Sequence, residues 1–204
     1  MESLFITPTK NSKIRILTPT EYDLIESSLA SVGKDEYVDA SEMEARENAR
    51  VVFRVAFYLA TRYRELVRLH DNPEWVMWER SMIQLPNSAQ GKAKQKIKTR
   101  YIPFNQNQIG TDLRLFFKVP ELLHHSNWNL RLKRAAEKSG IGTDGISPKM
   151  VRASLECWLL AAGWNQTKIC LRQGHDSFTA LKHYSAIPFS PLETEEITRR
   201  LTGW

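Results

Sequence analysis

The sequence has few cysteines and no long hydrophobic run. Its two cysteines, Cys157 and Cys170, form no Cys-x-x-Cys pair and stand beside no histidine cluster, which argues against a zinc site. No stretch approaches the roughly 18 consecutive apolar residues of a membrane-spanning helix. The N-terminus also lacks the charged-then-apolar pattern of a signal peptide. These absences predict a soluble cytoplasmic protein with reduced thiols and no membrane contact.

Acidic residues are outnumbered, at 23 Asp and Glu against 29 Lys and Arg, which gives a net charge of +6. A basic balance makes a polyanion a reasonable partner, although many basic proteins bind no nucleic acid. The 42% hydrophobic and 25% charged content is that of an ordinary globular protein. A length of 204 residues suits one sizeable core or two small ones.

The hydrophobic pattern predicts a mainly helical protein with one small antiparallel sheet. Thr18 to Glu21 form a capping box, which starts a helix that ends near Gly33. A longer helix ends near Leu59 and is followed, after a break at Ala60-Thr61, by a helical stretch at 65–69. Strand-like composition appears only between Trp75 and Phe104. Further helices are expected at 113–123, 127–138 (capped by Ser126), 148–163, 166–173, 177–184 and 192–201.

The first candidate functional residue is Arg62, which lies in the break between two apolar helices. An arginine that faces inward at a helix N-terminus is costly unless it meets an anion. The alternative is a surface ion pair between Arg62 and Glu65.

A second basic feature is the segment 91–100, where positive residues alternate with others. Alternation places such residues on one face of a strand, where they could contact phosphates. The alternative is a solvated edge strand protected by lysines. The alternating residues are Lys92, Lys94, Lys96, Lys98 and Arg100.

A third feature is the helix start at Ser147-Pro148, in whose first turn Lys149 and Arg152 share one face. Positive side chains oppose the helix dipole there, unless an anion such as phosphate also binds. The alternative is a basic pair that the fold tolerates.

Gly174-His175 and, nine residues after the histidine, Tyr184 complete the set. Each of these residues alone is usually structural. Together with the preceding features they supply two Arg, two Lys, a His and a Tyr, with no acidic cluster for a metal. This is the inventory for phosphoryl transfer that relies on positive charge alone.

The order and spacing of these residues resemble the tyrosine recombinases, which include phage integrases and chromosome-dimer resolvases. Residues 62–69 resemble the family's Arg-x-x-Glu-Leu-x-x-Leu motif, in a register that selects Arg62 and not Arg64. Lys149 to Arg152 and then 158–163 resemble its His-x-x-Arg helix and the following Trp-Leu-Leu-x-x-Gly. Gly174-His175 and Tyr184 match the family's Gly-His and the tyrosine nine residues later.

The sequence departs from the family pattern in three ways. Lys149 replaces the first histidine of His-x-x-Arg, as in integrases of archaeal viruses and plasmids. Ala60 stands where the family usually has glycine before the first arginine. The family's N-terminal helical domain, which completes a clamp around DNA, has no counterpart, so we expect a catalytic domain alone or a naturally short protein.

The resemblance covers residues 18–187, and it predicts a tyrosine recombinase catalytic-domain fold for them. Residues 1–17 would be an N-terminal arm or linker remnant. Residues 188–204 would be a tail helix that contacts a neighbouring subunit when the protein assembles.

The resemblance also implies an activity: site-specific DNA recombination, as by the integrase of a mobile element, through a 3′-phosphotyrosine on Tyr184. Arg62 and Arg152 would clamp the phosphate oxygens, Lys149 and His175 would add donors, and a hairpin lysine would protonate the leaving oxygen. We prefer Lys96 for that last role, with Lys94 second. Lys92, Lys94, Lys98 and Arg100 would bind DNA.

No metal, ATP or other cofactor is expected. The partners would be double-stranded DNA and further copies of the chain, four in the synaptic complex, associated with the nucleoid. One alternative is a type IB topoisomerase, against which the tail helix counts. The other is a non-catalytic DNA-binding module, which would lack an essential Arg or Tyr.

Overall fold

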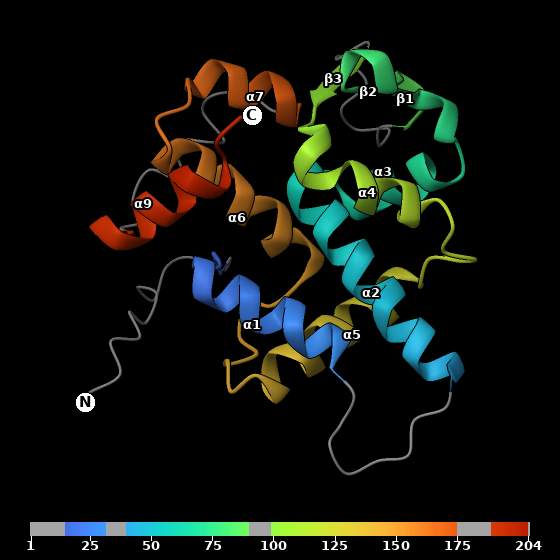
Figure 1. Ribbon diagram of the computed structural model, residues 1–204, viewed down its shortest axis with the longest axis vertical. Coiled ribbons are helices and arrows are strands. Elements are labelled where there is room, and N and C mark those ends of the chain that lie inside the picture. The colour runs from blue at the N-terminus through green and yellow to red at the C-terminus, as the bar shows by residue number, and fades with distance from the viewer. Residues whose placement is uncertain (1–14, 32–39, 90–98, 175–188, 204) are drawn as a thin grey trace.

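The computed structural model describes residues 15–31, 40–89, 99–174 and 189–203 (Figure 1). Within these residues the chain is mainly helical and has one antiparallel sheet of three strands, which confirms the predicted fold class. The helices are α1 (Pro19–Ala30), α2 (Ala40–Leu59), α3 (Tyr63–His70), α4 (Gln106–Phe116), α5 (His125–Lys138), α6 (Pro148–Ala161), α7 (Gln166–Gln173) and α9 (Pro191–Arg200). Short 3-10 helices span Pro73–Trp75, Trp78–Arg80 and Asn87–Ala89.

The helices pack around α2, which contacts α1, α4 and α6. The predicted capping box starts α1, because the Thr18 hydroxyl accepts from Glu21 and the Glu21 carboxylate accepts from the Thr18 amide. The centre of the core is aromatic, with Tyr22 of α1 and Phe57 of α2 packed against Trp158 of α6. These three helices therefore form the body to which the other elements attach.

The sheet consists of β1 (Val76–Met77), β2 (Met82–Leu85) and β3 (Arg100–Pro103), in that order, at one end of the helical body (Figure 1). Ile83 of β2 pairs with Val76 and with Ile102. Residues of one parity face the core, and Ile83, Leu85 and Ile102 are fully buried. Tyr101, of the other parity, is 50% exposed.

Two helix starts differ from the predicted ones. Helix α4 begins at Gln106, capped by Asn105, and ends before Pro120, whereas we predicted 113–123. Its first turns are polar, so hydrophobic spacing could not show them. Helix α5 is capped by His124, whose Nδ1 accepts from the Ser126 amide, and not by Ser126 itself. The helix predicted at 177–184 lies outside the described residues.

The first described residues belong to the core. The Leu17 amide donates to Ser154 Oγ (2.8 Å), and Trp158 Nε1 donates to the Leu17 carbonyl (2.8 Å). Leu17 is fully buried between these two side chains of α6. We expected an arm or linker over 1–17, but its described part, residues 15–17, is packed against the helical body.

Helix α9 also packs on the body, against α6 and α1. Ile197 and Leu201 are buried in the common core, and Arg200 binds Asp23 of α1 through two hydrogen bonds of 2.7 Å. Leu192, at the start of α9, is 78% exposed. Ile197 and Leu201 therefore pack within the helix's own chain, while Leu192 stays exposed, and the expected contact with a neighbouring subunit remains a prediction.

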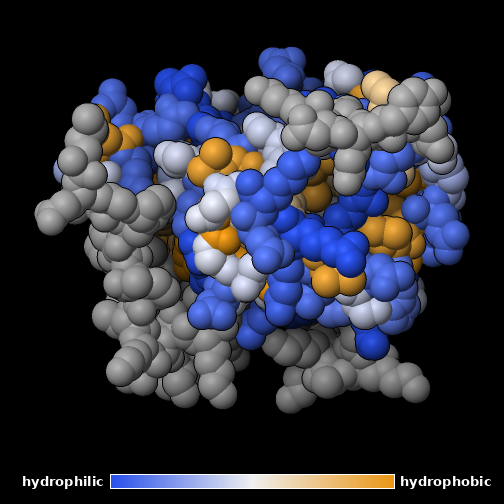
Figure 2. All heavy atoms as spheres, turned by 90° about the horizontal axis from the view of Figure 1, so that it is seen from below, coloured by the Kyte–Doolittle hydropathy of each residue, from blue (hydrophilic) through white to orange (hydrophobic). Residues whose placement is uncertain are grey.

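The surface seen from below Figure 1, on the side of α1 and α5, is mostly hydrophilic (Figure 2). Hydrophobic residues form separate patches there rather than one continuous face. Among the described residues, none of the helices has the length and apolar content needed to cross a bilayer.

Candidate active site

Three arginines from distant parts of the chain meet at one buried carboxylate, Glu65 of α3. Its Oε1 lies 2.6 Å from Nη1 of Arg62, and its Oε2 lies 2.8 Å from Nη2 of Arg100. Nη1 of Arg152, from α6, lies 3.8 Å from the same Oε2. Glu65 is only 1% exposed, so water hardly screens these charges. We call these three arginines and Arg172, described below, the arginine cluster.

The backbone before α3 explains how Arg62 reaches Glu65. Ala60 ends α2 in the left-handed region, with φ of 49°, a conformation that glycine adopts more readily. The resemblance places a glycine at this position, and the left-handed geometry accounts for that preference. Arg62 then occupies the N-cap of α3, and its amide donates to Glu65 Oε2 (2.9 Å). Glu65 therefore caps its own helix and gathers the arginines.

The end of α7 supplies a second meeting point. The carbonyl oxygen of Gln173 accepts from Arg100 Nη1 (2.7 Å) and from Arg152 Nη2 (2.5 Å). A carbonyl at a helix C-terminus carries partial negative charge, which suits two guanidinium groups. Gly174 follows in the left-handed region, with φ of 67°. The helix end that leads into the predicted Gly-His pair is thus tied to two cluster arginines.

Arg172 joins Arg100 and Arg152 as a third buried arginine, at 4% exposure, and the sequence reasoning did not identify it. It donates to the carbonyls of Tyr58 (2.7 Å) and Leu59 (3.1 Å) at the C-terminus of α2. It therefore joins α7 to the helix end that precedes Arg62. Nothing in the sequence distinguishes this arginine from an exposed one.

The cluster holds more positive than negative charge. Burial, reinforced by Arg62 and Arg100, lowers the pKa of Arg152 to about 10. Burial, reinforced by Arg100 and Arg152, lowers the pKa of Arg172 to about 9. Burial also lowers the pKa of Arg100. Crowded guanidinium groups in a low-dielectric site favour an anion between them.

Glu65 and the buried Glu156, which faces Arg152 and Arg172, are two carboxylates beside four guanidinium groups and do not neutralise this charge. Burial by itself would raise its pKa, but the surrounding Arg100, Arg152 and Arg62 hold that pKa below its usual value. Nη1 of Arg152 has no hydrogen-bond partner among the described residues. Buried polar groups are normally bonded, so an unbonded guanidinium nitrogen here fits a ligand oxygen.

The structure brings together two of the predicted catalytic residues, Arg62 and Arg152. Arg64 is exposed, and Arg62 is the one that contacts Glu65. Lys149 is exposed on the first turn of α6, and no hydrogen bond or ion pair links it to the cluster within the described ranges. The remaining predicted site residues lie outside the described residues: Lys92, Lys94, Lys96, Lys98, His175 and Tyr184.

Arg100 does not occupy the position expected for a DNA-binding residue. We predicted an exposed face shared with the hairpin lysines, but Arg100 is 2% exposed and bonds to Glu65. The cause is strand parity, because Arg100 and the fully buried Ile102 point to the same side of β3. Ile102 was therefore the sequence signal that pointed to an interior arginine.

Metal ligands are not gathered in the described part of the chain, where no group of three His, Cys, Asp or Glu side chains could hold an ion. Cys157 and Cys170 are both buried as free thiols. Burial raises the pKa of the Cys157 thiol, which disfavours the thiolate.

No protein-family model and no curated protein matches this chain. Solved structures do. The integrase of transposon Tn1549, in complex with transposon right end DNA, is similar with a TM-score of 0.67 and 14% identity, over 96% of this chain and 68% of that one. The XerH site-specific recombinase bound to its difH substrate is similar with a TM-score of 0.63 and 15% identity, over 86% of this chain and 51% of that one.

The XerA recombinase is a third similar structure, with a TM-score of 0.62 and 15% identity. The match covers 98% of this chain and 67% of XerA. Identities this low establish similarity of fold and leave the activity to be argued from the site. The chain therefore has the fold of a tyrosine recombinase catalytic domain.

Proposed function

We propose that this protein is a site-specific DNA recombinase that cleaves and rejoins DNA strands through a 3′-phosphotyrosine intermediate. Its partner would be double-stranded DNA, on which several copies assemble. Tyr184 would be the nucleophile, as the resemblance implies. The proposal includes independence from metal ions and ATP, because the bond energy stays in the tyrosine ester.

One observation carries the proposal: Arg62 and Arg152 meet beside a single buried carboxylate, and Arg152 Nη1 has no hydrogen-bond partner among the described residues. A phosphodiester has two nonbridging oxygens that carry one negative charge, and charge builds on them in the transition state. Guanidinium forks fit such oxygens and stay charged. The excess positive charge of the cluster therefore suits this one substrate group.

In the proposed reaction the Tyr184 oxygen attacks the phosphorus, a tyrosine–phosphate bond forms, and the bond to the 5′-oxygen breaks. Arg62 and Arg152 bind the nonbridging oxygens and stabilise the charge that develops there. The leaving 5′-oxygen takes a proton from a general acid, for which Lys96 is our first candidate and Lys94 the second. In the second step a 5′-hydroxyl of another strand attacks the phosphotyrosine and reseals the backbone.

Lys149 and His175 would donate further hydrogen bonds to the same oxygens. Lys149 stands at the second position of α6, with Arg152 one turn later. The family usually has a histidine at this position, whose ring N–H donates a hydrogen bond. The lysine ammonium group can donate a hydrogen bond in its place. Its exposure leaves the ammonium group accessible to a DNA strand above the cluster.

The test is formation of a covalent adduct with DNA. A pool of nicked duplexes with randomised sequence around the nick is incubated with the protein, and DNA bound through phenol-resistant linkage is recovered and sequenced. We expect the wild-type chain to enrich one DNA sequence in the covalently bound fraction. Tyr184→Phe should enrich none, although it should bind DNA as tightly as the wild type. Tyr101→Phe, which alters an exposed tyrosine of β3, is the matched control. An adduct formed by Tyr184→Phe would contradict the assignment.

A topoisomerase-like activity is the second candidate. The expected contact of the tail helix with a neighbouring subunit counts against it, yet Ile197 and Leu201 of this helix region pack on their own chain. A recombinase exchanges strands between two duplexes, whereas a topoisomerase relaxes supercoiled plasmid as a single subunit. Relaxation of plasmids without the enriched sequence, and no exchange between labelled duplexes, would favour the topoisomerase.

A further inference from the structure

Arg100 occupies a particular place in the arginine cluster. It is the only one of the three arginines around Glu65 that both binds Glu65 Oε2 and donates to the Gln173 carbonyl. Arg152 reaches the same two oxygens, but it bonds only to the carbonyl and stays 3.8 Å from Glu65 Oε2. Arg100 and Arg152 therefore both lie near Glu65 Oε2, and of these two arginines only Arg100 forms a hydrogen bond to it.

The backbone of α7 is shaped around Arg100. A Cβ atom at Gly174 would lie 2.6 Å from Arg100 Nη1 and 3.1 Å from its Cδ. These distances are too short for any residue other than glycine without displacing the guanidinium. The glycine therefore permits two things at once, a left-handed helix end and the approach of Arg100 to the Gln173 carbonyl.

We propose that Arg100 is a positioning residue that occupies Glu65 and thereby keeps Arg152 Nη1 available for a phosphate oxygen. This inference rests on the proposed function. In the absence of Arg100, Arg62 would still bind Glu65 through its Nη1 and its amide, but Oε2 would lose its guanidinium partner. Arg152 is the next guanidinium group near Oε2, and a buried carboxylate oxygen that has lost its charged partner favours a replacement. The short move from 3.8 Å to hydrogen-bond distance would turn Arg152 away from its ligand.

The proposal separates Arg100 from a merely structural arginine. A structural role predicts that loss of Arg100 acts through stability alone. The positioning role predicts that the harm comes from the Glu65 charge, and that neutralising Glu65 removes the harm. The pair Arg100 and Glu65 therefore offers a double-variant test.

The experiment compares four chains: wild type, Arg100→Met, Glu65→Gln and the double variant. Each is assayed well below its melting temperature, for single-turnover cleavage of the nicked duplex that the wild type selects and for binding of inorganic phosphate. We expect Arg100→Met to cleave about 30-fold or more slowly, with phosphate affinity reduced in parallel, because a misdirected donor costs part or all of the roughly 10²–10³-fold seen when one transition-state donor is removed. The double variant should recover about 10-fold of that loss.

Two further comparisons keep the test decisive. If Arg100→Met does not fold, Glu65→Gln is compared with the double variant, and the proposal requires their cleavage rates to agree within about 3-fold. A cleavage rate about 10-fold or more below that of Glu65→Gln in the double variant would overturn the proposal. Arg100 would then affect the rate even where Glu65 carries no charge. Arg100→Lys, which keeps the charge, should stay closer to wild type than Arg100→Met.

Arg54→Met is the control for the loss of an ion-paired arginine outside the cluster. Its partners are Glu26 and Asp112, neither of which contacts the cluster. It should lower the melting temperature and leave the cleavage rate unchanged. If the wild type forms no adduct, the proposed function fails. If the wild type reacts and all Arg100 variants match it, only the role of Arg100 fails.

Discussion

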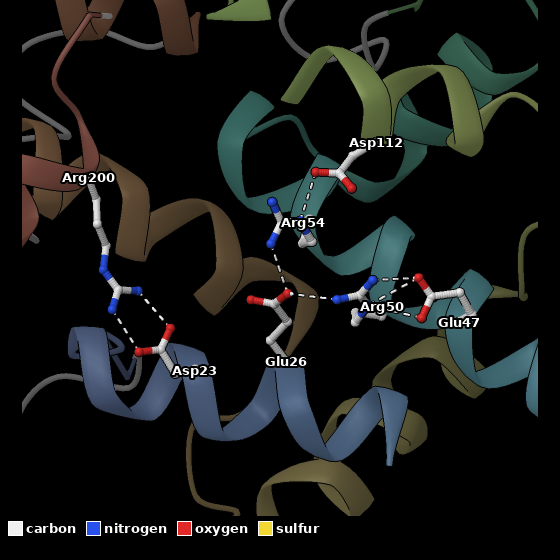
Figure 3. A network of polar contacts seen from close by, with 7 residues as sticks. All are labelled: Asp23, Glu26, Glu47, Arg50, Arg54, Asp112 and Arg200. Atoms are coloured by element: carbon white, nitrogen blue, oxygen red, sulfur yellow. Dashed lines mark hydrogen bonds and ion pairs between the residues drawn. The ribbon is translucent and has the colours of Figure 1, made fainter. Parts of the chain in front are cut away.

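Arginines gather in two regions of the molecule, and their partners differ. In the network that joins α1, α2, α4 and α9, each arginine meets at least one carboxylate (Figure 3). Arg54 donates to Glu26 and to Asp112, and although burial opposes it, these bonds raise its pKa. Hydrogen bonds to Asp23 raise the pKa of Arg200 in the same way.

For Arg100, Arg152 and Arg172 of the arginine cluster the pKa is lowered instead of raised. Burial lowers the pKa of Arg152 to about 10, and the neighbouring Arg62 and Arg100 lower it further. The arginines of the network in Figure 3, which we call the surface network, join helices through ion pairs with carboxylates. Carboxylates of the protein therefore balance their charge. The cluster keeps a surplus of charge that weakens the fold, which is the pattern expected where a ligand completes the site.

The largest difference is expected in catalysis. Arg152→Ala should slow single-turnover cleavage by about 10²–10³-fold, because it removes a charge-assisted contact to the developing phosphate charge. Arg54→Ala should leave that rate within about 2-fold of wild type, since it removes only contacts between helices. Gel-resolved adduct formation measures both. Equal losses in the two variants would mean that the cluster has no special role.

The next difference is expected in stability. Glu65→Gln should cost about 3–5 kcal/mol, because it leaves buried guanidinium groups without their shared carboxylate. Glu26→Gln, in the surface network, should cost about 1 kcal/mol. Urea unfolding at pH 7 measures both free energies. Similar losses of unfolding free energy in the two variants would show that the buried Glu65 contributes no more to stability than Glu26.

Stability at acidic pH should distinguish the wild type from Glu65→Gln. The pKa of Glu65 in the folded chain lies below its usual value, so its contribution to stability is complete above the unfolded pKa of about 4.3. That contribution is lost as the pH falls through the folded pKa. The wild type should therefore lose more stability than Glu65→Gln between about pH 5 and pH 3. Parallel losses in urea titrations over that range would contradict this.

A smaller effect is expected in the salt dependence of DNA binding. Arg152→Gln should reduce the slope of log Kd against log salt by about one unit, as expected for one lost phosphate contact. Arg68→Gln, which alters an exposed arginine of α3, is the matched control and should change the slope by less. Fluorescence anisotropy at four salt concentrations measures the slopes. An unchanged slope for Arg152→Gln would place the phosphate elsewhere.

The smallest effect is expected for the pair of Arg200, whose side chain is 18% exposed, and Asp23, whose side chain is 51% exposed. Asp23→Asn should cost less than about 1 kcal/mol, because solvent screens the pair. Its cleavage rate and salt slope should match wild type. A larger cost would show that α9 depends on this pair rather than on buried Ile197 and Leu201.

The parts of this molecule that follow local rules were predictable from sequence. Thr18 and Ser147 cap their helices as expected, and the change to strand composition after Trp75 marks the sheet. The meeting of Arg62 with Arg152 was predictable only through the family resemblance. No periodicity relates residues so far apart, and burial of charge is decided by neighbours that the sequence does not place together.

Arg100 and Arg172 show where the sequence reasoning stopped. Arg100 belongs to a basic alternation, and its burial depends on which strand face meets the core. Arg172 is buried because the end of α2, a hundred residues away in the chain, needs donors for its carbonyls. Such roles are set by tertiary contacts, and they become visible only when the helix ends are placed side by side.

The insertion of Leu17 between Ser154 and Trp158 has a consequence for how the chain folds. These hydrogen bonds join residues 137 and 141 positions apart, so Leu17 is synthesised long before the two side chains that it contacts. During synthesis the buried side of α1 lacks α6, and it stays open until residue 158 has emerged. Closure of this contact thus joins Leu17 to α6 across more than a hundred residues, and we expect it to be a late step in folding.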